Sequence, residues 1–110
     1  MAYANHKQNS GKNLTFVPVA QGAAGATELV AAVSGKKHKV VSAALAVDAT
    51  GTLKFNDGSS DLTGAYPISQ YGGFVLPPGV SHWFETASGS ALNLTTGVSK
   101  AFGVVAVVTE

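Results

Sequence analysis

The sequence predicts an all-β protein, folded as a single compact β-sandwich or jelly-roll-like barrel of eight or nine short antiparallel strands. Short runs rich in Val, Leu, Thr and Phe recur at near-regular spacing, and clusters of Gly, Pro, Asn, Asp and Ser separate them. No run shows a clear helical period. A chain of 110 residues has room for one folded unit, which we place at residues 13–110.

Residues 1–12 carry no apolar period and one aromatic side chain, so we expect an extended N-terminal arm. A partner could order this arm, most simply along the sheet edge of another subunit, and the alternative is a frayed terminus without function. The next run, residues 14–20, alternates and is rich in β-forming residues. Pro18 cannot donate a ladder hydrogen bond, which restricts this run to an edge strand or a bulge.

Three further strands are expected in the first half of the chain. Residues 27–34 contain β-branched valines and end at Gly35 after a strand-sized length, which favours a strand over a helix. Residues 37–49 form the longest regular run and should be a central strand, long enough to bend midway. The small alanines of this run would let another surface approach closely. Residues 52–55 alternate cleanly, so their apolar members should face the core.

Residues 72–85 form the most strongly patterned stretch. Paired glycines, an apolar run, two prolines and an aromatic pair predict a strand, a tight bend and a second strand. Pro77 and Pro78 should end the first strand at Leu76 and make the bend a corner between two sheets. Burying one large apolar side chain is worth about 1.5–3 kcal/mol, so this cluster should be the centre of the core. The predicted core residues are Phe55, Phe74, Leu76, Trp83, Phe84, Leu92 and Leu94.

The remaining segments complete the predicted sheets. Residues 62–71 are irregular, and Tyr66 and Tyr71 are candidates for a contact surface because each combines an apolar ring with a polar tip. Residues 91–95 alternate as a strand does. Residues 101–109 should close the chain as a buried strand.

The composition excludes several classes of function. Hydrophobic residues make up 45% of the chain and charged residues only 12%, which favours a partner that covers part of the surface. All seven basic residues are Lys, and only Lys36, Lys37 and Lys39 cluster, so we expect no nucleic-acid partner. The chain has no cysteine, which removes disulfides and thiolate chemistry. No apolar run suits a signal peptide or a membrane span, so we expect synthesis in a cytoplasm and no membrane partner.

Six short patches in the second half of the chain follow one another in a moderately specific order. They are Thr52-Leu-Lys-Phe55, Asp61-Leu-Thr-Gly64, Gly73-Phe-Val-Leu-Pro77, Trp83-Phe-Glu-Thr86, Gly89-Ser-Ala-Leu-Asn-Leu94 and Gly103-Val-Val-Ala-Val-Val-Thr-Glu110. In these patches the chain resembles the small phage virion proteins that decorate or cement the head. Each patch is also what a β-sandwich needs at a bend or an inner strand.

The resemblance implies a jelly-roll-like sandwich on the outer head surface of a virion. It further implies a homotrimer that binds the major capsid protein of an expanded shell and clamps neighbouring capsomers, without catalysis or a cofactor. No functional residue is carried over from the family, because the matched positions are structural. From the residues themselves, the candidate capsid contacts are Tyr3, His6, Lys7, Lys12, Tyr66 and Tyr71.

An enzyme is one competing interpretation, because jelly-roll folds can hold a metal between histidines and a carboxylate. His38, His82 and Glu85 could form such a set only if two distant strands meet. Asp57 and Asp61 flank a Gly-Ser-Ser turn, which turn chemistry explains better than calcium binding. We therefore expect neither a metal site nor enzyme activity.

A glycan- or receptor-binding module of a phage tail or head fibre is the other open interpretation. In such a module Trp83, Tyr66 or Tyr71 would stack on a sugar, with Asn or Asp beside it. We expect Trp83 to be buried, which would disfavour this interpretation.

Overall fold

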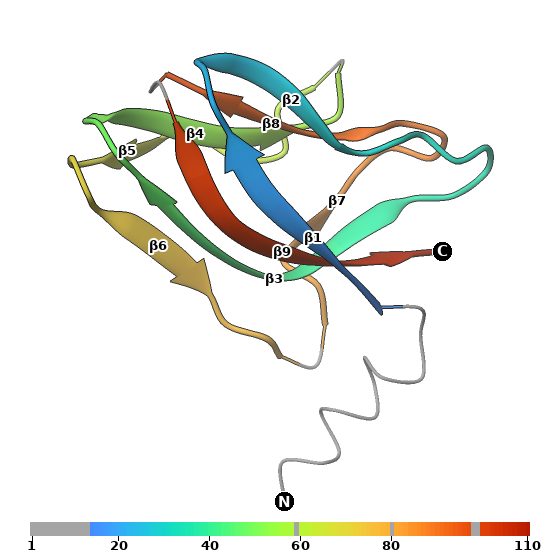
Figure 1. Ribbon diagram of the computed structural model, residues 1–110. Coiled ribbons are helices and arrows are strands. Elements are labelled where there is room, and N and C mark those ends of the chain that lie inside the picture. The colour runs from blue at the N-terminus through green and yellow to red at the C-terminus, as the bar shows by residue number, and fades with distance from the viewer. Residues whose placement is uncertain (1–13, 59, 80, 98–99) are drawn as a thin grey trace, which may run out of the picture.

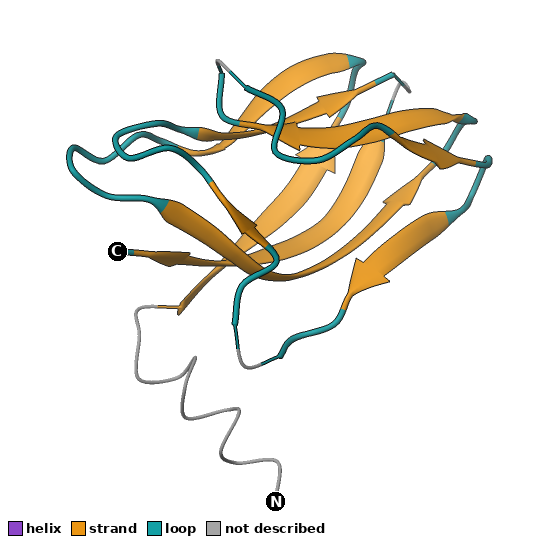
Figure 2. Cartoon of the chain, turned by 180° about the vertical axis from the view of Figure 1, so that it is seen from behind, coloured by secondary structure: helices purple, strands orange, loops and turns teal. Residues whose placement is uncertain are grey.

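The computed structural model describes residues 14–58, 60–79, 81–97 and 100–110, and within them the chain forms strands and loops without a helix (Figures 1 and 2). The strands are β1 (Leu14–Gln21), β2 (Gly25–Val30), β3 (His38–Val47), β4 (Gly51–Asn56), β5 (Tyr66–Ile68), β6 (Gly73–Leu76), β7 (Phe84–Glu85), β8 (Leu92–Thr96) and β9 (Ala101–Thr109). They lie in two antiparallel sheets that pack face to face (Figure 1).

The strand order is that of a jelly roll. The first sheet has the order β1-β9-β3-β6, with β7 also paired to β3, and the second sheet has the order β2-β8-β4-β5. Because β6 and β7 pair with successive parts of β3, they act as one interrupted edge strand, which leaves four strands in each sheet. The chain changes sheets at most of its connections, as jelly-roll topology requires. The prediction of an all-β sandwich is confirmed.

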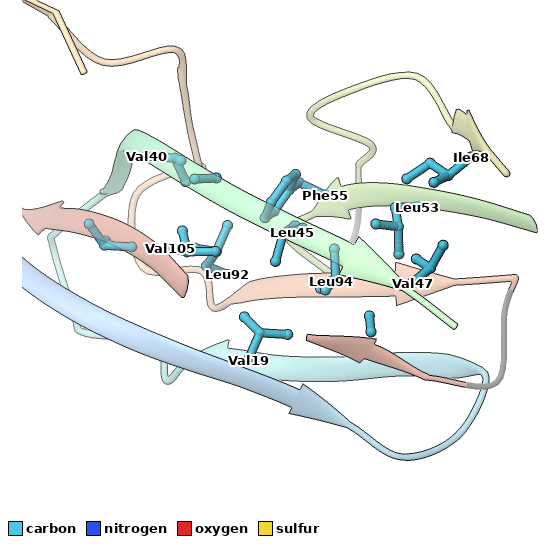
Figure 3. Close-up of a cluster of buried hydrophobic side chains, with 13 residues drawn as sticks. Val19, Val40, Leu45, Val47, Leu53, Phe55, Ile68, Leu92, Leu94 and Val105 are labelled. Carbon is cyan, nitrogen blue, oxygen red and sulfur yellow. The ribbon is translucent and has the colours of Figure 1, made fainter. Parts of the chain in front are cut away.

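Alternation places a continuous apolar core between the sheets (Figure 3). Leu53 and Phe55 of β4 are fully buried, and so are Leu92 and Leu94 of β8. The first sheet contributes the buried side chains of Val19, Val40, Leu45, Val47, Val105 and Val107. Among the residues predicted for the core, Phe55, Leu92 and Leu94 lie at its centre, and Phe74, Leu76 and Phe84 are partly buried against it.

Two features of the first sheet follow from local sequence. Strand β1 lies at an edge, so Pro18 interrupts no internal ladder. Strand β3 is internal, as predicted for the longest run, and its pairing with β9 shifts register between Val40 and Ser42. The extra residue, Val41, therefore forms a bulge in the middle of β3.

The segment 77–83 differs from its prediction. Strand β6 ends at Leu76, as the two prolines predict, but β7 then pairs with the same edge of β3. The ladder resumes where the backbone N–H of Trp83 donates to the carbonyl oxygen of Val40, at 2.8 Å. The bend is therefore an excursion from one sheet edge, and the prediction of a corner between two sheets is wrong.

The predicted burial of Trp83 is also wrong, because 51% of this residue is exposed. Phe84 faces the core, where its ring lies 5.0 Å from that of Phe55. Successive residues of a strand point to opposite faces, so Trp83 must point away from the core when Phe84 points into it. The indole Nε1 instead donates to the carbonyl oxygen of Pro77, at 2.9 Å.

Candidate functional site

The outer face of the first sheet, here called the apolar face, carries almost no polar side chains. Val17 and Val19 of β1 and Val105 and Val107 of β9 point toward the core, so their sequence neighbours point outward. The residues of the apolar face that are not covered by the chain itself are Phe16, Pro18, Ala20, Ser42, Ala44, Ala46, Gly73, Val75, Trp83, Phe102 and Val104.

Exposed large apolar side chains gather on this face. Of the seven found among the described residues, five belong to it: Phe16, Val75, Trp83, Phe102 and Val104. The exposed fraction reaches 65% for Phe16 and 66% for Val75. The other two, Val33 and Tyr71, lie in loops. A concentration of this kind on one sheet face is typical of a surface that another protein covers.

A shallow groove of about 720 Å³ crosses the apolar face at the end of β3. Ala44, Ala46, Gly73 and Gly103 form its floor, and its walls include Phe102 and Val75. A Cβ atom at Gly73 would collide with the carbonyl oxygen of Leu45, and one at Gly103 with that of Ala44. The two glycines therefore keep the floor at backbone level.

The outer face of the second sheet, here called the polar face, has the opposite character. Its outward residues on β4 and β8 are Thr52, Lys54, Asn56, Asn93 and Thr95. The Asn56 side-chain amide donates to the Thr95 hydroxyl at 2.6 Å, and Lys54 pairs with Asp61 at 3.2 Å. A hollow of about 380 Å³ between these side chains is lined mostly by polar groups. The polar face is therefore suited to solvent.

Charged side chains border the apolar face where β3 begins. Lys37 pairs with Glu85 and Lys39 with Glu110, each at 2.9 Å, and His82 lies 3.1 Å from Glu85. The hydrogen bond from Lys37 holds the pKa of the Glu85 carboxyl below its ordinary value, and the charges of Lys37, His82 and Lys39 add to this effect. The hydrogen bond to Glu110 raises the pKa of Lys39. We call these five residues the charged rim.

The tyrosines predicted as contact residues do not form one surface. The Tyr66 ring is half-buried and lies 4.6 Å from the Phe74 ring, so it is part of the packing around β6. Tyr71 is 79% exposed and has a left-handed backbone, with a φ of 62°. The other candidate contacts, Tyr3, His6, Lys7 and Lys12, lie outside the described residues, as does the whole arm of residues 1–12.

The histidines and carboxylates considered for a metal are engaged otherwise. His38 is fully buried, its Nε2 donates to the carbonyl oxygen of Ala31, and its Nδ1 is hydrogen-bonded to the Thr109 hydroxyl, each at 2.8 Å. Both ring nitrogens are thus used, while His82 and Glu85 belong to the charged rim. Across the described ranges, no group of three or more His, Cys, Asp or Glu residues is placed to hold a metal.

The Asp57 carboxylate has a structural role in its turn. Its Oδ1 accepts from the backbone N–H of Ser60 at 2.8 Å, and its Oδ2 accepts from that of Ala87 at 3.1 Å. Asp57 therefore fixes the turn after β4 to the segment before β8, as turn chemistry predicts. Among the residues that the structure describes, no helix is long and apolar enough to cross a membrane.

Comparisons with known proteins show the fold. No protein-family model and no curated protein matches the sequence. A chain of the cyanophage Pam1 capsid asymmetric unit is similar, with a TM-score of 0.50 and 17% identity over 89% of this chain and 84% of that chain. A chain of the extra small virus VLP of the giant freshwater prawn Macrobrachium rosenbergii has a TM-score of 0.43 and 16% identity over 89% of this chain and 75% of that chain.

Proposed function

We propose that this protein is a structural component of a virion, a decoration or cement protein on the outer surface of an expanded phage head. It would bind the major capsid protein and clamp neighbouring capsomers. The observation that carries the proposal is the contrast between the two outer faces of the sandwich. One face holds five exposed large apolar side chains, and the other holds Thr, Lys and Asn.

The contrast gives the molecule an orientation. Covering one exposed Phe or Val side chain contributes about 1.5–3 kcal/mol, so a protein partner on the apolar face would be stabilised substantially. The polar face gains nothing comparable, because its side chains are polar and already bond to one another. A subunit lying with its apolar face toward protein and its polar face toward solvent fits the outside of a particle.

The fold supports the same proposal. The similar chain of the Pam1 capsid asymmetric unit is matched over most of its length, so a jelly roll of about this size occurs in that capsid. A protein that binds only the expanded lattice stabilises it by linkage, and several weak contacts suffice when one assembly touches several capsomers. We also propose the homotrimer and the arm of residues 1–12 as parts of this binding. The candidate capsid contacts in the arm are Tyr3, His6, Lys7 and Lys12.

A glycan- or receptor-binding module of a tail or head fibre is the second candidate. The exposure of Trp83 favours it, because an accessible indole can stack on a sugar. However, Trp83 lies among the apolar groups of the first sheet, while the polar side chains that could bind hydroxyl groups line the opposite face. We therefore rank it second.

The deciding experiment is quantitative mass spectrometry of purified particles, counting this chain against the major shell protein. Hundreds of copies in a simple ratio to the shell would support the decoration role. A handful of copies would favour a tail or fibre, and absence from the particle would contradict both candidates. Purified protein should also bind expanded heads and fail to bind unexpanded ones.

A further inference from the structure

We propose that a second copy of this chain covers the apolar face, with Phe16 of one copy seated in the groove of the next. The inference names a partner for that face and so rests on the proposed function. Each copy would supply one projecting ring and one groove to the assembly. The groove, lined by Ala44, Ala46, Gly73 and Gly103, is complete only when the partner's ring fills it.

Phe16 projects from the edge of the sheet. It lies on β1, and the residue opposite it on β9 is Ala106, whose methyl group gives the ring little to pack against. The ring is therefore 65% exposed, although burying a phenylalanine is among the most favourable contributions a side chain can make. Within one copy, the sequence places a large apolar group where nothing covers it.

The groove has the matching chemistry. Its floor is alanine methyl groups and glycine backbone, its walls are Phe102 and Val75, and none of its lining residues is charged. A charged or strongly polar group placed there would lose its hydration without finding a partner. The occupant should therefore be an apolar side chain, and a volume of about 720 Å³ leaves room for an aromatic ring.

Phe16 and the groove cannot meet within one chain. Phe16 is opposite Ala106, Ala106 is opposite Ser42, and the groove begins further along β3 at Ala44 and Ala46. At ordinary strand dimensions, Phe16 and Ala46 are therefore roughly 15 Å apart. Between two copies this contact can form twice about a two-fold axis, or once per neighbour in a ring that closes when the rotation permits.

One chain carries both the exposed ring and the apolar groove, which favours a second copy over an unrelated partner. The apolar face has no charged residue over its β1, β9 and β6 positions, so two copies bring no like charges together there. The charged rim lies at the other end of β3 and is already paired internally. The face measures roughly 450 Å² from strand dimensions, which is below the ~800 Å² per partner of a standard stable interface. Association should therefore be weak and concentration-dependent.

Cysteine cross-linking between copies tests the contact directly. The chain has no cysteine, so every disulfide formed joins two introduced cysteines, and an isotope label distinguishes the mixed disulfide from the two homodisulfides. Phe16→Cys and Ala46→Cys are prepared separately, one of them isotope-labelled, then mixed and oxidised. We expect the mixed disulfide to form faster than with the matched control, Phe16→Cys mixed with Thr52→Cys on the polar face. Equal rates in the two mixtures would overturn the proposal.

Filling the groove provides a second test. Ala46 is exposed, so Ala46→Leu should leave the melting temperature nearly unchanged while it blocks the groove. We expect this variant and Phe16→Ala each to weaken self-association by about tenfold or more in sedimentation equilibrium, and Lys54→Ala to leave it unchanged. An Ala46→Leu variant that associates more tightly, or a wild-type chain that stays monomeric up to about 1 mM, would overturn the self-contact.

The two proposals can fail separately. Hundreds of copies per particle without the mixed disulfide would leave the decoration role standing and remove the self-contact. A mixed disulfide in a protein present in a handful of copies would support the self-contact and remove the decoration role.

Discussion

The Nε2 atom of buried His38 donates a hydrogen bond of 2.8 Å to the carbonyl oxygen of Ala31. Its Nδ1 is hydrogen-bonded to the Thr109 hydroxyl. The imidazole therefore joins the loop after β2 to the start of β3 and the end of β9, two neighbouring strands of the first sheet. This side chain, considered for a metal from sequence, is instead a cross-link inside the sandwich. Its ring satisfies two polar groups that lie away from water.

Replacing His38 with Ala should destabilise the fold. The substitution leaves the Ala31 carbonyl and the Thr109 hydroxyl without their partner and creates a cavity, so we expect a loss of about 2–4 kcal/mol in the free energy of unfolding. Denaturant titration measures it. His82→Ala is the matched control, because His82 is partly exposed and its contact with Glu85 is a surface pair, so its loss should cost less than about 1 kcal/mol. Equal effects of the two substitutions would contradict the assigned role.

Gly103 should not tolerate a side chain. Its φ of 148° and the nearby carbonyl oxygen of Ala44 leave no space for a Cβ atom, so Gly103→Ala forces β9 away from β3. We expect a loss of about 1–3 kcal/mol in thermal or denaturant unfolding. Gly22→Ala serves as the control, because no atom lies within 4 Å of the position of its Cβ. A neutral Gly103→Ala would mean that the two strands are not so close.

The strands could be predicted because their signals are local. The run 101–109 matches β9, and the alternating runs 52–55 and 91–95 lie within one residue of β4 and β8. Side-chain direction in 72–85 could not be predicted in the same way. Trp83 and Phe84 are adjacent and both apolar, and only pairing with distant β3 decides which of them faces the core.

The apolar face is visible in the sequence of β9. Strand β9 is apolar at nearly every position, a pattern that predicts a buried strand. In a two-layer sandwich only one face of a strand packs on the core. The outward Phe102 and Val104 therefore remain exposed, and sequence alone does not distinguish a face covered by its own chain from one left for a partner.

The ion pair between Lys37 and Glu85 should make the free energy of unfolding depend on pH. Because Lys37 lowers the pKa of Glu85 in the folded state, the stabilisation is fully present above the ordinary value of 4.5 and is lost as the pH falls through the folded pKa. Urea unfolding at about pH 7 and about pH 3 should therefore show a smaller acid-induced loss for Glu85→Gln than for the wild type. Lys37→Met should have the same effect, and adding Glu85→Gln to it should change little further. An acid-induced loss in Glu85→Gln as large as in the wild type would contradict the assignment.

Removing residues 1–12 should separate binding from folding. The described sandwich begins at Leu14, and its core draws on strands that follow this residue. If the arm anchors the protein to the head, its deletion should weaken binding to expanded heads and leave the thermal unfolding temperature nearly unchanged. If head binding is unaltered, the arm does not anchor the protein, and the alternative of a terminus without function is supported.

Trp83 provides an intrinsic probe of what covers the apolar face. It is the single tryptophan of the chain and is half exposed, so acrylamide should quench its fluorescence efficiently in the isolated protein. Its neighbours on that face are the residues proposed to be covered in the assembly, so quenching should fall when the protein self-associates or binds heads. Phe16→Ala should delay this protection to higher protein concentration, since it weakens the self-contact without touching the indole. Quenching that stays efficient on saturated heads would show that Trp83 still faces solvent there, and it would favour the glycan-binding candidate over the covered face.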